Sequence, residues 1–96
     1  MQLSPGFEWD PEHAEEVERQ TGFHLSDGVH VFNDPDFDYL QVGPEERNGE
    51  LRYRAIGRTQ WGTVVMVAYT MRAGRRRLIW IRAASRREQE AFYESQ

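Results

Sequence analysis

The stretch LRYRAIGRTQWGTVVMVAYTMRAGRRRLIWIRA, residues 51–83, decides the fold expected of this chain. Leu51, Tyr53 and Ala55 alternate with Arg52 and Arg54, and this period of two is typical of a strand with one buried face. Residues 63–71 are almost all apolar and β-branched or aromatic, as expected of a central strand. Residues 75–83 are expected to form a third strand. Short turns that contain glycine separate the three segments, so we expect an antiparallel meander.

Helical patterns flank the expected meander on both sides. Asp10-Pro11 marks the start of a first helix, because aspartate caps and proline suits the first helical position. A weaker helical turn is expected over residues 26–32, and the polar residues 34–49 are expected to form a loop. Ser85 to Glu88 have the pattern of a capping box that opens a last helix. The expected fold class is therefore α+β, with two N-terminal helices, an antiparallel β-sheet meander and a C-terminal helix.

Length and composition exclude several classes of protein. The 96 residues allow one modest core, so we expect a single domain over residues 1–96. The absence of cysteine excludes a disulfide framework and any thiolate metal site. No apolar run approaches the roughly 18 residues that a membrane span requires. The N-terminus also lacks the basic region and the apolar stretch of a signal peptide.

The formal net charge of -4 conceals a segregation of charge along the chain. Residues 1–50 contain 13 acidic and 2 basic residues, whereas residues 51–96 contain 3 acidic and 10 basic residues. Every basic residue is an arginine. The basic half favours binding to a polyanion, and the acidic half is expected either to fold over it or to face a basic partner.

Several short motifs stand in order between residues 7 and 93. They are Phe7-Glu8-Trp9-Asp10-Pro11, Val31-Phe32-Asn33-Asp34-Pro35, Ile56-Gly57-Arg58, Val65 to Thr70 with Arg72, Arg82, Ala84-Ser85-Arg86-Arg87-Glu88 and Tyr93. In this order and spacing they resemble the BrnT family of bacterial toxins. The resemblance covers nearly the whole chain.

The resemblance implies a RelE-like fold and a function. BrnT-like proteins are metal-independent endoribonucleases that stop translation, so the resemblance implies RNA as substrate, no cofactor and a cytoplasmic location. It also implies a partner, which is a BrnA-like antitoxin whose ribbon-helix-helix part binds DNA. Toxin and antitoxin of this kind typically form a heterotetramer with two copies of each.

The first expected helix departs from the family pattern. The family usually has Lys, Asn, Lys and His where this chain has His13, Val17, Gln20 and Thr21. These four positions stand at helical spacing, so we expect them on one face of the helix. Two functions therefore remain open. The chain is either an active ribonuclease toxin or a catalytically impaired BrnT-like protein that binds the antitoxin or RNA.

Metal-independent RNA cleavage requires a base, an acid and cations that stabilise the phosphorane. Histidine exchanges protons near neutral pH, which makes His13 the candidate acid or base. Arginine holds phosphate with a charged fork, and tyrosine donates hydrogen bonds. The other candidate catalytic residues are therefore Arg58, Arg82, Arg86 and Tyr93. For each of them the alternative is a structural role at the surface or at the edge of the core.

Candidate RNA-binding residues are four arginines and a tryptophan of the second half: Arg54, Arg72, Arg76, Trp80 and Arg87. Strict alternation along residues 75–83 places Arg76, Trp80 and Arg82 on one face of the strand. Cations beside an aromatic ring are typical of surfaces that grip single-stranded nucleic acid. Arg52 is expected on an ordinary polar outer face. The three histidines are scattered along the chain, so no metal site is expected.

Overall fold

The computed structural model describes residues 2–96. Its elements, in chain order, are β1 (Gln2–Ser4), β2 (Phe7–Trp9), α1 (Pro11–Thr21), the 3-10 helix η1 (Leu25–Gly28), α2 (Val29–Asn33), β3 (Leu40–Arg47), β4 (Glu50–Arg58), β5 (Val64–Arg72), β6 (Arg75–Ala83) and α3 (Arg86–Glu94). The α+β class expected from the sequence is confirmed. The three long strands of the meander and the three helical regions are present.

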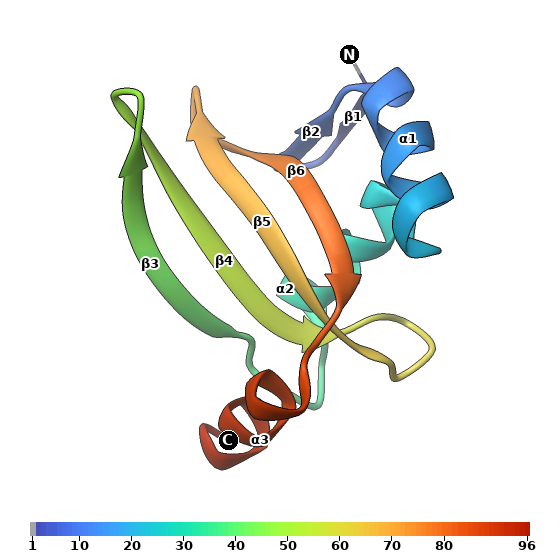
Figure 1. Ribbon diagram of the computed structural model, residues 1–96, viewed down its shortest axis with the longest axis vertical. Helices are drawn as coiled ribbons and strands as arrows, with labels where there is room; N and C mark the ends of the chain where they lie inside the picture. The colour runs from blue at the N-terminus through green and yellow to red at the C-terminus, as the bar shows by residue number, and fades with distance from the viewer. Residues whose placement is uncertain (1) are drawn as a thin grey trace.

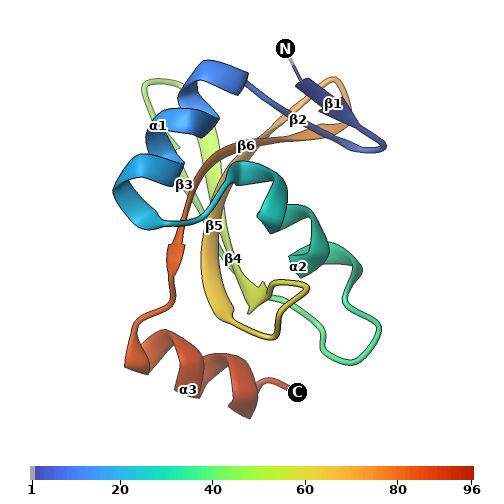
Figure 2. The same cartoon turned by 90° about the vertical axis from the view of Figure 1, so that its right-hand side faces the viewer.

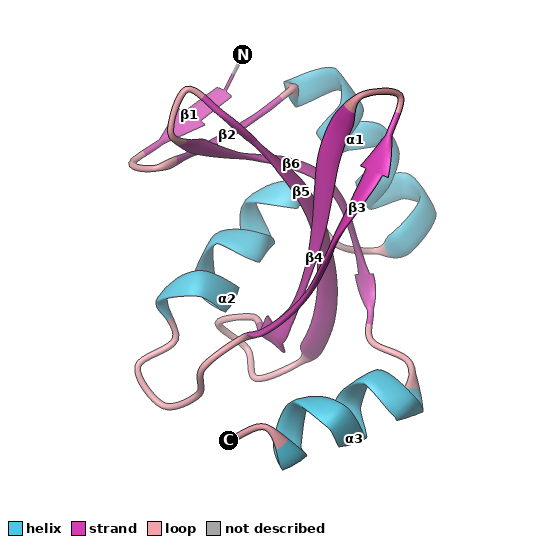
Figure 3. Cartoon of the chain, turned by 90° about the vertical axis from the view of Figure 1, so that its left-hand side faces the viewer, coloured by secondary structure: helices cyan, strands magenta, loops and turns pink. Residues whose placement is uncertain are grey.

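A six-stranded sheet in the order β1-β2-β6-β5-β4-β3 forms the centre of the molecule. Helices α1 and α2 lie on one side of it, and α3 lies at the end of the sheet that is remote from α1 (Figures 1 and 2). Figure 3 views the sheet from the side opposite to that of Figure 2, so that β3 and β4 cross in front of α1. We call this second side the open face.

Both helix starts that the sequence predicts are confirmed. The side chain of Asp10 accepts a hydrogen bond of 3.0 Å from the backbone N–H of Glu12, and Pro11 occupies the first helical position. At the start of α3, Ser85 accepts from the N–H of Glu88, and Glu88 accepts in return from the N–H of Ser85. These caps satisfy N–H groups that have no partner within the helix.

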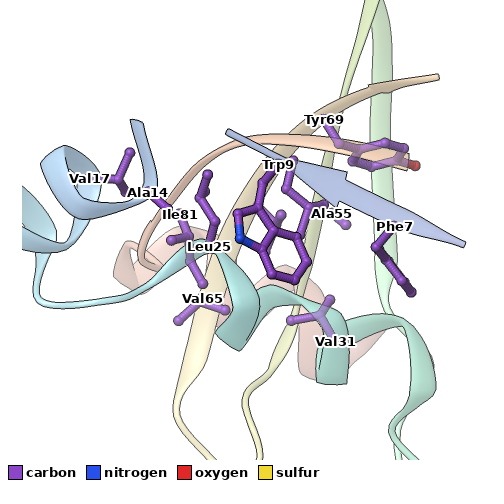
Figure 4. Packing of buried hydrophobic residues seen from close by; sticks show 12 residues of the cluster. Phe7, Trp9, Ala14, Val17, Leu25, Val31, Ala55, Val65, Tyr69 and Ile81 are labelled. Atoms are coloured by element: carbon purple, nitrogen blue, oxygen red, sulfur yellow. The ribbon is translucent and has the colours of Figure 1, made fainter. Parts of the chain in front are cut away.

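The main core lies between the sheet and the segment that runs from α1 to α2. Trp9 is 6% exposed and lies among Leu25, Val31 and Ala55 (Figure 4). The short strand β2 therefore places a large aromatic residue in the main core. A second, smaller core lies under α3, where Phe92 is fully buried.

Residues 34–49 were expected to form a loop, and this prediction is wrong over Leu40–Arg47. That segment is β3, an antiparallel edge strand paired with β4. Most of its side chains are exposed, and the ladder is irregular between Val42 and Glu45. A mostly polar edge strand gives no apolar alternation, because few of its side chains are buried. Its order comes from backbone hydrogen bonds to β4.

The antiparallel expectation holds for β3 to β6 but is wrong for the sheet as a whole. Strand β2 pairs with β6 in parallel, with Phe7 opposite Arg76 and Glu8 opposite Arg77. Because β2 and β6 stand almost at opposite ends of the chain, this pairing leaves no local signal in the sequence. The observed sheet is mixed.

Strand β6 contains a β-bulge in its middle. The ladder with β5 pairs Leu78 with Tyr69 and Trp80 with Ala68, so that Ile79 is an extra residue without a register partner. One extra residue reverses the alternation of side chains along a strand. Even-numbered residues before the bulge therefore face the side of the sheet that odd-numbered residues face after it.

The bulge overturns the prediction that Arg76 shares a face with Trp80 and Arg82. The guanidinium of Arg76 lies 4.3 Å from the ring centroid of Phe32, on the side of the main core. Arg82 reaches Glu88 of α3 instead. The two arginines are separated because strict alternation holds only for an uninterrupted strand.

Candidate functional site

A pocket of about 210 Å³ lies where the start of α1 meets the open face of the sheet. We call it the arginine pocket. Its polar lining comes from α1, β4, β5 and β6: Asp10, His13, Glu50, Arg52, Thr70, Arg72 and Arg77. Three arginines and two carboxylates line the pocket, an excess of one positive charge among the lining residues themselves; Glu8, outside the lining, pairs with Arg77. This is an arrangement that attracts an anion.

His13 is held in the arginine pocket by the bulge of β6. Its Nε2 lies 2.7 Å from the carbonyl oxygen of Ile79, the residue without a register partner. A carbonyl oxygen only accepts hydrogen bonds, so Nε2 carries the proton. In the neutral ring, Nδ1 then keeps a free lone pair. His13 is thus fixed in the tautomer that presents Nδ1 as the atom able to accept a proton.

Arg52 and Arg72 converge on one anionic group. Nε of Arg52 lies 3.5 Å from one carboxylate oxygen of Glu50, and Nη2 of Arg72 lies 3.6 Å from the other. The two guanidinium groups therefore approach a single carboxylate from two strands. Arg77 is fixed separately, because its Nη1 lies 3.0 Å from a carboxylate oxygen of Glu8. The pocket brings cations from three strands into one hollow with His13.

A shallow groove of about 300 Å³ lies on the open face beside the arginine pocket. We call it the Trp80 groove. Its lining comes from β3 to β6: Glu45, Arg47, Arg52, Tyr53, Arg54, Met66, Ala68 and Trp80. Arg52 belongs to both hollows. The ring centroids of His13 and Trp80 are 6.4 Å apart, so a lining residue of the groove lies close to the candidate acid or base.

Arg58 and Arg82 lie outside the arginine pocket, and each is bound to a carboxylate. Arg58 donates to both carboxylate oxygens of Asp34, at 3.0 and 3.2 Å, and its guanidinium stacks 4.1 Å from the ring centroid of Phe37. Arg82 donates to both oxygens of Glu88, at 2.7 and 3.1 Å. These two arginines fasten α2 and α3 to the sheet.

The two ion pairs shift the acidity of their carboxylates. Hydrogen bonds from Arg58 lower the pKa of Asp34 from 3.8 to about 2, against the opposing effect of burial. Hydrogen bonds from Arg82 lower the pKa of Glu88 from 4.5 to about 2 in the same way. Both carboxylates therefore stay ionised at neutral pH and hold their arginines.

The remaining predicted residues of α3 are remote from His13. Arg86 forms an exposed ion pair with Glu90, one turn further along the helix. Tyr93 is 49% exposed and contacts Phe37 and Phe92. Figures 1 and 2 show α3 and α1 at different ends of the sheet. The predicted catalytic residues therefore do not gather at one place.

Arg76 is enclosed by aromatic rings on the core side of the sheet. Its guanidinium lies between 4.3 and 5.9 Å from the ring centroids of Phe7, Phe32, Tyr39 and Tyr69. It also donates a 3.1 Å hydrogen bond to the hydroxyl of Tyr39. Such contacts stabilise a partly desolvated cation. The surroundings of Arg76 indicate a structural role.

Of the predicted RNA-binding residues, Arg54, Arg72 and Trp80 lie on the open face. Arg87 lies near Arg54 in a third hollow, between α3 and the β3–β4 edge. Sequence reasoning missed Arg77, and it placed Arg52 on an ordinary polar face. The signal for Arg77 was its pairing with Glu8 of β2, which no local pattern reveals.

Only His13, of the four first-helix positions that depart from the family pattern, lines the arginine pocket. Val17 is fully buried in the main core. The hydroxyl of Thr21 donates to the carbonyl of Val17, and Gln20 donates to Glu16. The departures at these three positions therefore affect the core and the surface of α1 rather than the lining of the pocket.

Within residues 2–96, no group of three histidine, aspartate or glutamate side chains is placed to hold a metal ion. No helix in the same part of the chain is long and apolar enough to cross a membrane.

The family model described as "Ribonuclease toxin, BrnT, of type II toxin-antitoxin system" matches residues 9–88. Among solved structures, the ribonuclease toxin BrnT of Brucella abortus has the same fold, with a TM-score of 0.63 and 19% sequence identity. The match covers 81% of this chain and 94% of that one. No curated protein sequence matches the chain significantly. Because the family model spans most of the sequence, the chain belongs to the BrnT family of ribonuclease toxins of type II toxin–antitoxin systems.

Proposed function

We propose that this chain is a metal-independent endoribonuclease whose active site is the arginine pocket. One observation carries the proposal: His13, anchored through Nε2 on the carbonyl of Ile79, lines a single pocket together with three arginines. Nucleophilic attack by a ribose 2′-hydroxyl on the adjacent phosphate needs a proton acceptor and positive charge around the phosphate. The pocket offers both.

Nδ1 of His13 accepts the proton of the 2′-hydroxyl, whose oxygen forms a bond to phosphorus. The 5′-oxygen leaves with the electrons of the broken P–O bond and takes a proton from water, and the protonated His13 returns its proton to the hydroxide that remains. The products are a 2′,3′-cyclic phosphate and a 5′-hydroxyl. Arg52, Arg72 and Arg77 stabilise the negative charge on the phosphorane oxygens.

The convergence of Arg52 and Arg72 on Glu50 supports their role toward phosphate. Their guanidinium nitrogens already approach a single carboxylate to about 3.5 Å. A phosphate group presents oxygens of the same charge and similar spacing. In the proposal, a phosphate of the RNA enters beside Glu50 and competes with it for these arginines.

The biological setting follows from the family. Type II toxins act with a protein antitoxin, and we propose a BrnA-like antitoxin with a ribbon-helix-helix DNA-binding part. We propose that the two form a heterotetramer in the cytoplasm, that cleavage of RNA inhibits translation, and that residues 1–96 act as a single domain. The acidic first half of the chain supports the binding of a basic partner segment.

The experiment is RNA cleavage by purified protein in the presence of EDTA. We expect fragments that end in a 2′,3′-cyclic phosphate and fragments that begin with a 5′-hydroxyl, resolved by gel electrophoresis and mass spectrometry. Intact RNA at high protein concentration would contradict the proposal. If the intact RNA is nevertheless bound, the result supports the alternative of a catalytically impaired, RNA-binding BrnT-like protein.

A further inference from the structure

We propose that the Trp80 groove is a base-reading subsite that prefers guanine, with Glu45 as the residue that determines specificity. The inference rests on the proposed function, which places the phosphate in the arginine pocket. It assigns the base of the same nucleotide to the neighbouring Trp80 groove. It concerns which nucleotide the protein selects, which the family membership does not say.

The position of the groove fits a nucleotide whose phosphate occupies the arginine pocket. Arg52 lines both hollows, and the ring of Trp80 lies 6.4 Å from that of His13. A volume of about 300 Å³ lies at the lower end of the range of small-molecule sites. The groove therefore offers space for a single base next to the proposed reaction centre.

The chemistry of the groove combines a stacking surface with cations. The indole of Trp80 is partly exposed, and Met66 and Ala68 supply apolar surface beside it. Stacking of a base on an aromatic ring contributes to the binding of single strands without selecting a sequence. Arg47 and Arg54 stand at the groove and supply charge for the backbone on either side. These residues explain binding but not selection.

Glu45 is the one carboxylate that lines the groove. It stands opposite Arg52 in the β3–β4 ladder, yet no ion pair or side-chain hydrogen bond joins it to another described residue. An ionised carboxylate only accepts hydrogen bonds. A carboxylate with no internal partner, in the groove that Trp80 also lines, is available to accept hydrogen bonds from a base.

Guanine fits a carboxylate better than the other three bases do. Its N1–H and N2–H₂ donors lie side by side and match both carboxylate oxygens. Adenine and cytosine each offer an amino group next to an acceptor nitrogen, which a carboxylate repels. Uracil offers a single N3–H between two carbonyl oxygens. A paired set of hydrogen bonds to one base edge gives about tenfold discrimination or more.

The test measures binding without cleavage. Fluorescein-labelled 2′-deoxy oligonucleotides of uracil with a single guanine, inosine, adenine or cytosine lack the attacking 2′-hydroxyl, and their Kd is measured by fluorescence anisotropy. We expect the guanine oligonucleotide to bind about tenfold more tightly than the adenine or cytosine one. Inosine, which lacks the N2 amino group, is expected to bind with intermediate affinity.

The decisive variant is Glu45→Gln, and Glu46→Gln is its matched control. Glu46 is the next residue of the same strand, is exposed, and does not line the groove. Both variants remove one negative charge, so both are expected to bind all oligonucleotides more tightly. Only Glu45→Gln is expected to reduce the preference for guanine to less than twofold. A guanine preference that survives in Glu45→Gln, or its absence in the wild-type protein, overturns the inference.

Failure of the inference and failure of the proposed function give different results. If the wild-type protein cleaves RNA without regard to the base and binds the four oligonucleotides equally, only the guanine subsite is wrong. If the protein leaves RNA intact, the ribonuclease proposal is wrong, and the binding assay still decides the base preference. If the wild-type protein cleaves RNA beside guanine and Glu45→Gln cleaves beside every base, the result supports both the ribonuclease proposal and the guanine subsite.

Discussion

Arg58 donates two hydrogen bonds to Asp34 and thereby fastens the end of β4 to the end of α2. The carboxylate of Asp34 is almost fully buried, with 1% of the side chain exposed. The two residues belong to the motifs Asn33-Asp34-Pro35 and Ile56-Gly57-Arg58. The two motifs therefore meet in the fold as the two halves of one contact.

The pH dependence of stability should report this ion pair. The pKa of Asp34 is about 2 in the folded protein, against an ordinary value of 3.8. A lowered pKa stabilises the fold above about pH 4, and this contribution is lost as the pH falls from about 4 to 2. The shift corresponds to about 2 kcal/mol. In Asp34→Asn we expect lower stability at pH 7 and a flatter decline in acid, measured by urea unfolding at several pH values. An unchanged acid profile would show that Asp34 contributes nothing.

Gly57 allows the close approach of α2 to β4. A Cβ atom at this position would lie 2.8 Å from Cγ1 of Val31, which is shorter than any normal contact. We expect Gly57→Ala to lower the free energy of unfolding by about 1–3 kcal/mol, because the core cannot accept the added methyl group without displacement. Combining it with Val31→Ala should recover part of this loss in a double-mutant cycle. Strictly additive losses would exclude the clash as the cause.

His13 should be required for cleavage but not for folding. In His13→Gln the amide still donates a hydrogen bond to the carbonyl of Ile79 but cannot accept the proton of the 2′-hydroxyl. We expect the cleavage rate to fall by roughly 10²- to 10⁴-fold, with an almost unchanged melting temperature. His13→Ala should lose both the anchor and the activity. Near wild-type cleavage by folded His13→Gln would remove His13 from the reaction.

The variant Arg82→Gln tests whether the active site lies in the arginine pocket or at the α3 end of the sheet. Sequence reasoning made Arg82 a candidate catalytic residue, whereas its guanidinium in the structure is bound to Glu88. We expect Arg82→Gln to destabilise the protein by about 1 kcal/mol, since the pair is partly exposed. Cleavage per folded molecule should be unchanged. A folded Arg82→Gln protein that no longer cleaves RNA would restore Arg82 to the active site.

Glu50 should act as an internal competitor of the RNA phosphate. Its carboxylate accompanies Arg52 and Arg72, so Glu50→Gln frees both guanidinium groups. We expect RNA affinity to rise several-fold and its dependence on salt to become steeper, measured by anisotropy across a salt series. Glu46→Gln changes the net charge equally, away from the pocket. If both variants raise affinity to the same extent, the effect is one of net charge alone.

The parts of the fold that the sequence predicted are those with local signals. The caps at Asp10 and Ser85 and the three strands of the meander depend on neighbouring residues, and all were confirmed. Strand β2 is only three residues long and depends on its partner β6, far along the chain. Strand β3 is polar because it forms an edge. Neither pattern can be read from a single segment.

The candidate site was predicted in part for the same reason. Residue type was enough to select His13, Arg72 and Trp80, which the structure places on or beside the open face. The prediction selected Arg76, whereas the structure places Arg77 in the arginine pocket. The reason is the bulge at Ile79, because one extra residue reverses the alternation of side chains along a strand. The type of a residue alone could not show that Arg58 and Arg82 are paired with the carboxylates of Asp34 and Glu88.

The pairing of β2 with β6 has a consequence for synthesis of the protein. His13 and the carbonyl that holds it are 66 residues apart, and Glu8 and Arg77 are 69 residues apart. The N-terminal segment is made first, yet it finds its partners only when the last strand has emerged. A chain that stops before residue 77 lacks both the carbonyl that anchors His13 and one of the three pocket arginines, Arg77. An unfinished copy of this toxin therefore carries no assembled pocket.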